Sequence, residues 1–96
     1  MNISSSSNSV NISGNIKSIN DFQAIKTTID SLKTSHESLI IHIKDSISIT
    51  SSVIGYFNKI ILKDGIELSL QVGNEQLVEL FDDLNLSTLF NVRKIA

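Results

Sequence analysis

The sequence predicts one small α/β domain with a mixed β-sheet and the element order β-β-α-β-α-β-α-β. Two observations lead to this class. Apolar residues recur with a period of two in several short segments, as in strands, and with a period of three to four in the segments between them, as in helices. The length of 96 residues suits one hydrophobic core, so we expect residues 1–96 to form a single domain.

The chain begins with a predicted β-hairpin. Residues 4 to 9 are Ser and Asn only, which favours turns, so we place the hairpin loop there and Ile3 in the preceding strand. Residues 10 to 16 alternate between apolar and polar side chains, as expected for a strand with one buried face. Gly14 lies within this alternation and predicts a β-bulge.

The first helix is predicted from Asp21 onward. Its apolar stripe consists of residues spaced three or four apart, namely Phe22, Ile25, Ile29 and Leu32. We expect Ser18 or Asn20 to be its N-cap. A polar run over residues 33 to 38 ends the pattern, and residues 39 to 43 then predict a central strand because apolar side chains occupy both of its faces.

A second helix is predicted to start near Ser51, after a run rich in hydroxyl groups. Its broad apolar arc consists of Val53, Ile54, Phe57, Ile60 and Ile61. Asp64-Gly65 indicates a stop, and the strict alternation of residues 66 to 72 predicts a strand with one face in water. A third helix follows Gly73-Asn74, and residues 89 to 95 are expected to end the domain with a short strand.

The third helix has an apolar stripe opposite an acidic face. The stripe that we expect to be buried consists of Leu77, Leu80, Phe81 and Leu84. The acidic face is interpreted as a solvated surface. Because the last three strands are joined through helices, we expect them to be parallel neighbours with right-handed crossovers. The N-terminal hairpin makes the sheet mixed.

Composition argues against several classes of function. A formal net charge of -2 leaves no surplus of Lys and Arg for nucleic-acid phosphates, and an aromatic content of 5% leaves few side chains for stacking on bases. The chain has no Cys, and His36 and His42 are the only histidines, so we expect neither a metal site nor a cofactor. A hydrolase would need a nucleophile, a base and an oxyanion pocket, but no Gly-x-Ser-x-Gly motif is present and His42 lies in the middle of a predicted strand. We therefore expect no enzymatic activity, and an enzyme is the third option after two binding functions.

Cellular location is expected to be cytoplasmic. The first residues have neither a basic region nor an apolar run, so they do not predict a signal peptide. No apolar stretch approaches the about 20 residues that a membrane-spanning helix needs, so we expect no insertion into a membrane. No pattern in the sequence indicates an oligomeric state.

The segment that leads into the second helix is the main candidate for a functional site. Sites in parallel sheets gather where the carboxyl ends of strands lead into helices, and residues 44 to 52 place several hydroxyl groups there. Free N–H groups and the helix dipole favour negative charge at such a place by about 0.3 to 1 kcal/mol, which suits a phosphoserine. The alternative is that Thr50, Ser51 and Ser52 only cap the helix, and the residues alone favour capping.

Four segments, in order, carry a resemblance to a known family. An early strand with a Gly is similar to Val-Asn-Ile-Ser-Gly-Asn-Ile at residues 10–16, and an Asp-Ser-Ser-Gly-Leu-Gly motif is similar to Thr-Ser-Ser-Val-Ile-Gly at residues 50–55. The turn into the fourth strand is similar to residues 64–68, and a helix before a final strand is similar to residues 80–86. On these segments, Val10 to Val92 resembles a STAS domain, the family of bacterial anti-sigma factor antagonists.

The resemblance implies a function in partner switching. Such domains bind an anti-sigma factor, often a serine kinase, and phosphorylation of the first Ser of the motif breaks the complex until a phosphatase restores binding. That position is Ser51 here, and an alignment shifted by one residue would make Ser52 the acceptor. The docking surface is expected between residues 46 and 59. The candidate partner-binding residues are Asp45, Ser46, Ser48, Thr50, Ser51, Ser52, Gly55, Tyr56 and Lys59.

Two departures from the motif leave an alternative open. Thr50 stands where the family has Asp, and Val53 stands where it has the first Gly. These changes suit a constitutive, non-phosphorylated STAS subunit of a transporter or signalling assembly. The second helix has more apolar surface than one core contact needs, with Tyr56 and Leu62 at or beyond the margins of its arc. Partner docking and packing between the sheet and neighbouring helices explain this surface equally well.

Overall fold

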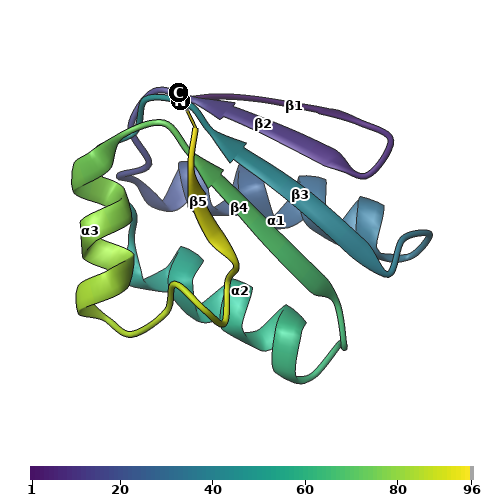
Figure 1. Ribbon diagram of the computed structural model, residues 1–96. Coiled ribbons are helices and arrows are strands. Elements are labelled where there is room, and N and C mark those ends of the chain that lie inside the picture. Colours follow the sequence, from purple (N-terminus) through teal and green to yellow (C-terminus); the bar gives the residue numbers. More distant parts are fainter. Residues whose placement is uncertain (96) are drawn as a thin grey trace.

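Within residues 1–95, five strands form one mixed sheet, and three helices connect the last four of them (Figure 1). The computed structural model describes residues 1–95. The elements follow one another along the chain as β1 (Asn2–Ser6), β2 (Ser9–Ser13), α1 (Ile19–Lys33), β3 (Ser38–Ile43), α2 (Ser51–Leu62), β4 (Glu67–Val72), α3 (Glu75–Asp83) and β5 (Val92–Lys94). The predicted α/β class and the mixed sheet are therefore confirmed.

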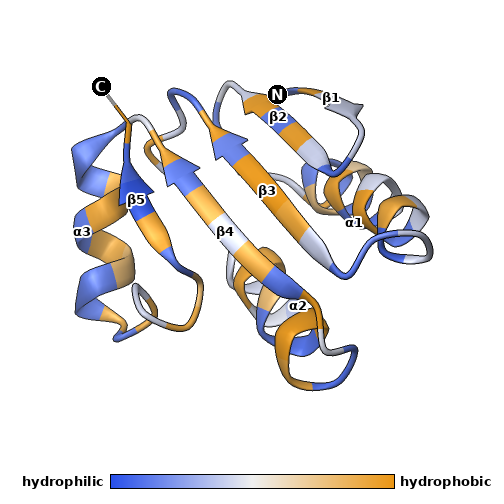
Figure 2. Cartoon of the chain, turned by 45° about the vertical axis from the view of Figure 1, so that its right-hand side comes forward, coloured by the Kyte–Doolittle hydropathy of each residue, from blue (hydrophilic) through white to orange (hydrophobic). Residues whose placement is uncertain are grey.

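The strands lie side by side in the same order as in the sequence. β1 pairs antiparallel with β2, whereas each following pair, from β2·β3 to β4·β5, is parallel. Because every crossover advances in the same direction, one handedness puts all the connecting helices on one face of the sheet. Figure 2 shows α1, α2 and α3 on that face and the opposite face without a helix.

The core lies between the sheet and the helices. Alternate residues of the inner strands are buried there, namely Val10, Ile12, Leu39, Ile41, Ile43, Leu68, Leu70 and Val72. Phe57 of α2 and Phe81 of α3 each meet the ring of Phe90 edge to face, with centroids 5.9 Å apart. This geometry is favourable for aromatic pairs, and it links α2 and α3 to the segment before β5.

The uncovered face of the sheet is mostly polar. The strand register places one residue from each strand in a row across it, Ser4, Asn11, His42, Gln71 and Arg93. Ile40, which is half-buried, also lies on this face. The prediction of a central strand at residues 39 to 43 is confirmed, because β3 is the third of the five strands.

Two predictions for the N-terminal hairpin are wrong. The loop expected at residues 4 to 9 is only a turn at Ser7 and Asn8, and the residues beside it pair in β1 and β2. Pairing in the sheet uses backbone groups, so Ser can occupy an edge strand despite its preference for turns. Gly14 is not in a bulge: it follows the end of β2 with φ +81°, a conformation that glycine adopts without a Cβ penalty.

One residue of the predicted α3 stripe is also misplaced. Leu84 is 47% exposed because α3 ends at Asp83 and Leu84 is the C-cap residue. Leu77 and Phe81 of the same stripe are buried as expected. The stripe was therefore predicted one residue too far along the chain.

Candidate docking site

Two loops at the carboxyl ends of the parallel strands β2 and β3 are joined by hydrogen bonds. The Asp45 carboxylate accepts a bond of 2.7 Å from the backbone N–H of Gly14. The Asn15 side-chain oxygen accepts a bond of 3.0 Å from the N–H of Ile47. The β3–α2 loop, residues 44 to 50, is therefore held against the β2–α1 loop, residues 14 to 18. We call these two hydrogen-bonded loops the platform.

Ser46 is the internal anchor of this platform. It is fully buried, accepts the N–H of Ile16 at 3.1 Å, and donates to the carbonyl oxygen of Ser48 at 2.6 Å. The hydroxyl of Ser48 donates in turn to the carbonyl of Ile16 at 3.0 Å. Ser46 was predicted to contact a partner. Because it is buried, it is not accessible to a partner, and its hydrogen bonds instead hold the β3–α2 loop in place. Ser48 is half-buried and shares that role.

The start of α2 matches the predicted position. Thr50 is its N-cap, and the Thr50 side-chain oxygen accepts the N–H of Val53 at 3.3 Å. Ser51 and Ser52 are the first two helical residues, and both are exposed. Because Thr50 supplies the cap, the hydroxyl groups of Ser51 and Ser52 are not needed for it.

Two isoleucines expose large apolar side chains at this platform. Ile47 in the β3–α2 loop is 53% exposed, and Ile19, the first residue of α1, is 74% exposed. Ile47 lies within residues 46 to 59, where the docking surface was expected, but neither isoleucine was predicted as a contact residue. Ile19 lies outside the apolar stripe of α1, and Ile47 stands between two serines in a loop, so each was an apolar residue without an assigned place in the core. We refer to Ile19 and Ile47 as the exposed isoleucine pair.

The exposed side of α2 continues the surface away from the platform. Gly55 and Lys59 are exposed and lie three or four residues apart from one another and from the serines, so they follow Ser51 and Ser52 along one helical face. The structure therefore brings together four predicted site residues on α2, and Asp45, which belongs to the platform, is exposed as well.

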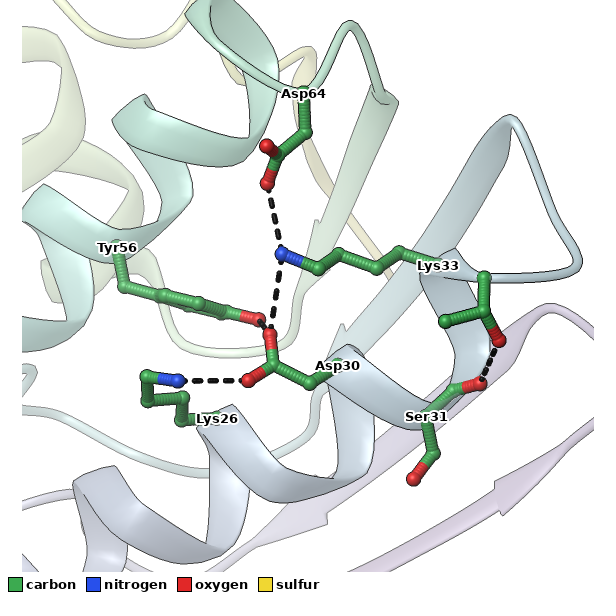
Figure 3. Close-up of polar contacts among 7 residues, drawn as sticks. Lys26, Asp30, Ser31, Lys33, Tyr56 and Asp64 are labelled. Carbon is green, nitrogen blue, oxygen red and sulfur yellow. Dashed lines mark hydrogen bonds and ion pairs between the residues drawn. The ribbon is translucent and has the colours of Figure 1, made fainter.

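Tyr56 does not belong to this surface. Only 5% of it is exposed, because α1 covers the margin of α2 where it lies. Its hydroxyl donates to the carboxylate of Asp30, and Lys26 and Lys33 pair with the same carboxylate at 2.7 and 3.2 Å (Figure 3). Lys33 also reaches Asp64 at 2.8 Å. The prediction that Tyr56 contacts a partner is thus corrected to a structural role between the helices.

The ionisation of this cluster is fixed by its contacts. Burial raises the pKa of the Asp30 carboxyl, but the hydrogen bonds from Lys26, Tyr56 and Lys33 outweigh it and bring the pKa to about 2. Burial, and then the hydrogen bond to Asp30, raise the pKa of the Tyr56 phenol far above its usual range. Near neutral pH the proton stays on Tyr56 and the charge on Asp30, so the pair holds α1 against α2 in one ionisation state.

The two histidines belong to different parts of the chain. His36 follows α1, and its Nδ1 lies 3.0 Å from the carbonyl oxygen of Leu32, whereas His42 is in β3 on the uncovered face of the sheet. Within residues 1–95, no group of three His, Asp or Glu side chains is placed to hold a metal ion. None of the three helices in this part of the chain has the length and apolar character needed to cross a lipid bilayer.

Comparison of the chain with family models, with curated proteins and with solved structures gave no match.

Proposed function

We propose that this domain is a STAS-like docking module that binds a protein partner, an anti-sigma factor or a serine kinase, through the platform and the start of α2. The observation that carries the proposal is the exposed isoleucine pair on a platform whose backbone is already fixed. Exposed apolar side chains beside polar ones are typical of protein interfaces. A fixed backbone lowers the ordering cost of binding, because little conformational freedom remains to be lost.

Phosphorylation of Ser51 would act as the switch in this module. A phosphoserine carries a charge of about -1.5 to -2 and would lie at the edge of an apolar contact, where a partner must remove its water. In the free domain the same group would meet the N–H groups of the first turn of α2, which favour negative charge. Modification would therefore weaken the complex without unfolding the domain. Ser51 is ranked before Ser52.

The start of α2 also supports a second candidate function. Thr50 caps the helix without any charge, and Val53 is fully buried, so the first turn is complete without a phosphoryl group. A constitutive subunit of a transporter or signalling assembly would use the same surface and never be modified. The two candidates share the docking surface and differ only in the switch.

The docking surface is tested with the purified domain as bait in lysate of its own organism. Ile47→Ser removes an exposed apolar side chain at the platform, and Leu62→Ser removes one that is 66% exposed at the other end of α2. We expect the unaltered domain and Leu62→Ser to retain the same partner and Ile47→Ser to lose it. Equal capture by all three proteins would refute the proposed surface.

The switch is tested by intact-mass measurement of the captured complex after addition of ATP. One added phosphate, absent in Ser51→Ala and accompanied by release of the partner, supports the switch at Ser51. If Ser52→Ala, and not Ser51→Ala, loses the added phosphate and the release of the partner, the acceptor is Ser52. Stable capture without added mass supports the constitutive subunit. Turnover of a small substrate by the domain without a partner would contradict both candidates.

A further inference from the structure

The two edges of the sheet are protected to very different degrees. β5 is only three residues long and includes Arg93 and Lys94, and both shortness and charge discourage an edge strand from pairing with another chain. β1 has five residues, Asn2 to Ser6, and none is charged. No residue from 1 to 16 has a charged side chain, and the chain has no Pro. The β1 edge therefore has none of these protections.

The outward backbone groups of β1 are arranged symmetrically. A two-residue turn at Ser7 and Asn8 makes Ser6 and Ser9 the hydrogen-bonded pair that closes the hairpin. In an antiparallel ladder such pairs alternate with pairs that are not hydrogen-bonded, so Ile3 and Ser5 direct their N–H and C=O groups away from β2. These two residues lie on either side of Ser4, which makes the edge complementary to itself under a two-fold rotation.

The side of α1 next to this edge is neutral beyond its first turn. Lys26, Asp30 and Lys33 lie on the side of α1 that meets α2. About half a turn around the helix lie Ala24, Thr28 and Ser31, which are small and neutral. Asp21 lies on the same side in the first turn, where its carboxylate accepts the backbone N–H groups of Lys17 and Ser18. A two-fold axis perpendicular to the sheet keeps the helices of both copies on the same face, so these sides of the two α1 helices would approach one another. A two-fold axis brings the groups close to it near their own copies, and the neutral side chains of Ala24, Thr28 and Ser31 give no like-charge repulsion there.

From these observations we propose that β1 pairs antiparallel with β1 of a second copy of this chain about a two-fold axis through Ser4, joining the two sheets. Ile3 of each copy then lies opposite Ser5 of the other, and each such pair exchanges both N–H···O bonds. The two Ser4 residues face each other on the uncovered side as a pair that is not hydrogen-bonded. The inference uses no residue of the docking site and is independent of the proposed function.

Charged substitutions at Ser4 test whether β1 pairs with β1 of a second copy. We expect sedimentation equilibrium of the unaltered protein to give twice the chain mass of 10.6 kDa. Ser4→Lys and Ser4→Asp each place like charges opposite one another at a Cα separation of about 4.5 Å, so each variant alone is expected to be monomeric. Their equimolar mixture is expected to dimerise again. Asn11→Lys, one strand in from the edge on the same face, is the matched control and is expected to stay dimeric.

Crosslinking provides a second, independent measurement. The chain has no Cys, so Ser4→Cys and Asn11→Cys each introduce a single thiol. Mild oxidation should link Ser4→Cys into a covalent dimer and leave Asn11→Cys unlinked, because a disulfide needs Cα atoms about 4.4 to 6.8 Å apart. A monomeric unaltered protein at millimolar concentration overturns the proposal. A dimer in which Asn11→Cys crosslinks and Ser4→Cys does not also overturns it, since the copies then meet elsewhere.

Discussion

The phenol of Tyr56 on α2 donates a hydrogen bond to the carboxylate of Asp30 on α1, between two helices that otherwise direct apolar side chains into the same core. The ring of Tyr56 lies edge to face with Phe22 of α1 at 6.3 Å, so one residue joins the helices through both an apolar and a polar contact. The contact therefore fixes the position of α1 relative to α2 and contributes to the stability of the fold.

Tyr56→Phe should lower the free energy of unfolding by about 1 kcal/mol. Hydrogen bonds to charged groups contribute about 1.5 to 3 kcal/mol, and we take a smaller value because the Asp30 side chain is 34% exposed to solvent. Urea unfolding near neutral pH measures the change. The ring contacts with Phe22 and Phe57 remain in this variant, so the dispersion of its amide and methyl NMR signals should stay native. A loss of several kcal/mol would mean that ring packing had been disturbed as well.

The Asp30 cluster should make part of the stability depend on pH in acid. The pKa of Asp30 is about 2 in the folded protein against an ordinary value of 3.8, so the unfolded chain binds the proton more readily. Its contribution to stability is therefore complete above pH 4 and disappears as the pH falls toward 2. Asp30→Asn should be less stable than the unaltered protein at pH 6, and the difference should shrink between pH 4 and pH 2. A difference that stays constant over this interval would contradict the pKa of about 2.

Much of the fold could be predicted because local patterns and tertiary packing agree. Ser18 caps α1 with Asp21 in a capping box, Thr50 caps α2, and Asn74 caps α3, each next to an apolar period that begins where the cap predicts. The alternation at residues 66 to 72 became β4 because one face of the sheet is covered and the other is not.

The edge strand β1 and the contact between α1 and α2 could not be predicted from local patterns. Ser4 to Ser6 have a turn composition, and only the register with β2 makes them a strand. Tyr56 was placed at the margin of an apolar arc because the sequence does not show that α1 packs against that side of α2. Of the site, the start of α2 was predicted, whereas the burial of Ser46 depends on a hydrogen bond to Ile16, a residue 30 positions away in the sequence.

Gly73 and Gly55 should respond in opposite directions to the same substitution. A Cβ added at Gly73 would lie 1.9 Å from the carbonyl oxygen of Lys44, so Gly73→Ala must displace backbone, and we expect a loss of about 2 to 3 kcal/mol. A Cβ added at Gly55 in α2 meets nothing within 4 Å, so Gly55→Ala should gain about 0.5 to 1 kcal/mol in helix stability. Thermal unfolding of the two variants checks both signs. Destabilisation by Gly55→Ala would indicate a contact that its open surroundings do not predict.

Ser46→Ala should destabilise the protein by about 1 to 3 kcal/mol, because the N–H of Ile16 loses its acceptor in a buried place. The exposed Ser31→Ala is the control and should change stability by less than about 0.5 kcal/mol.

Ser46→Ala also tests whether docking depends on a well-ordered platform, because it leaves the exposed side chains of the platform unchanged. Ser46 is buried, so a partner cannot touch it. Its loss removes one of the hydrogen bonds that hold the β3–α2 loop against the β2–α1 loop, and we expect Ile47 to become more mobile. Hydrogen exchange at the amide of Ile16 should accelerate more than exchange at residues in β4. Capture of the partner should weaken while the exposed isoleucine pair is chemically unchanged, because binding must now order the loop. Unchanged capture together with fast exchange at Ile16 would show that docking does not depend on a fixed platform.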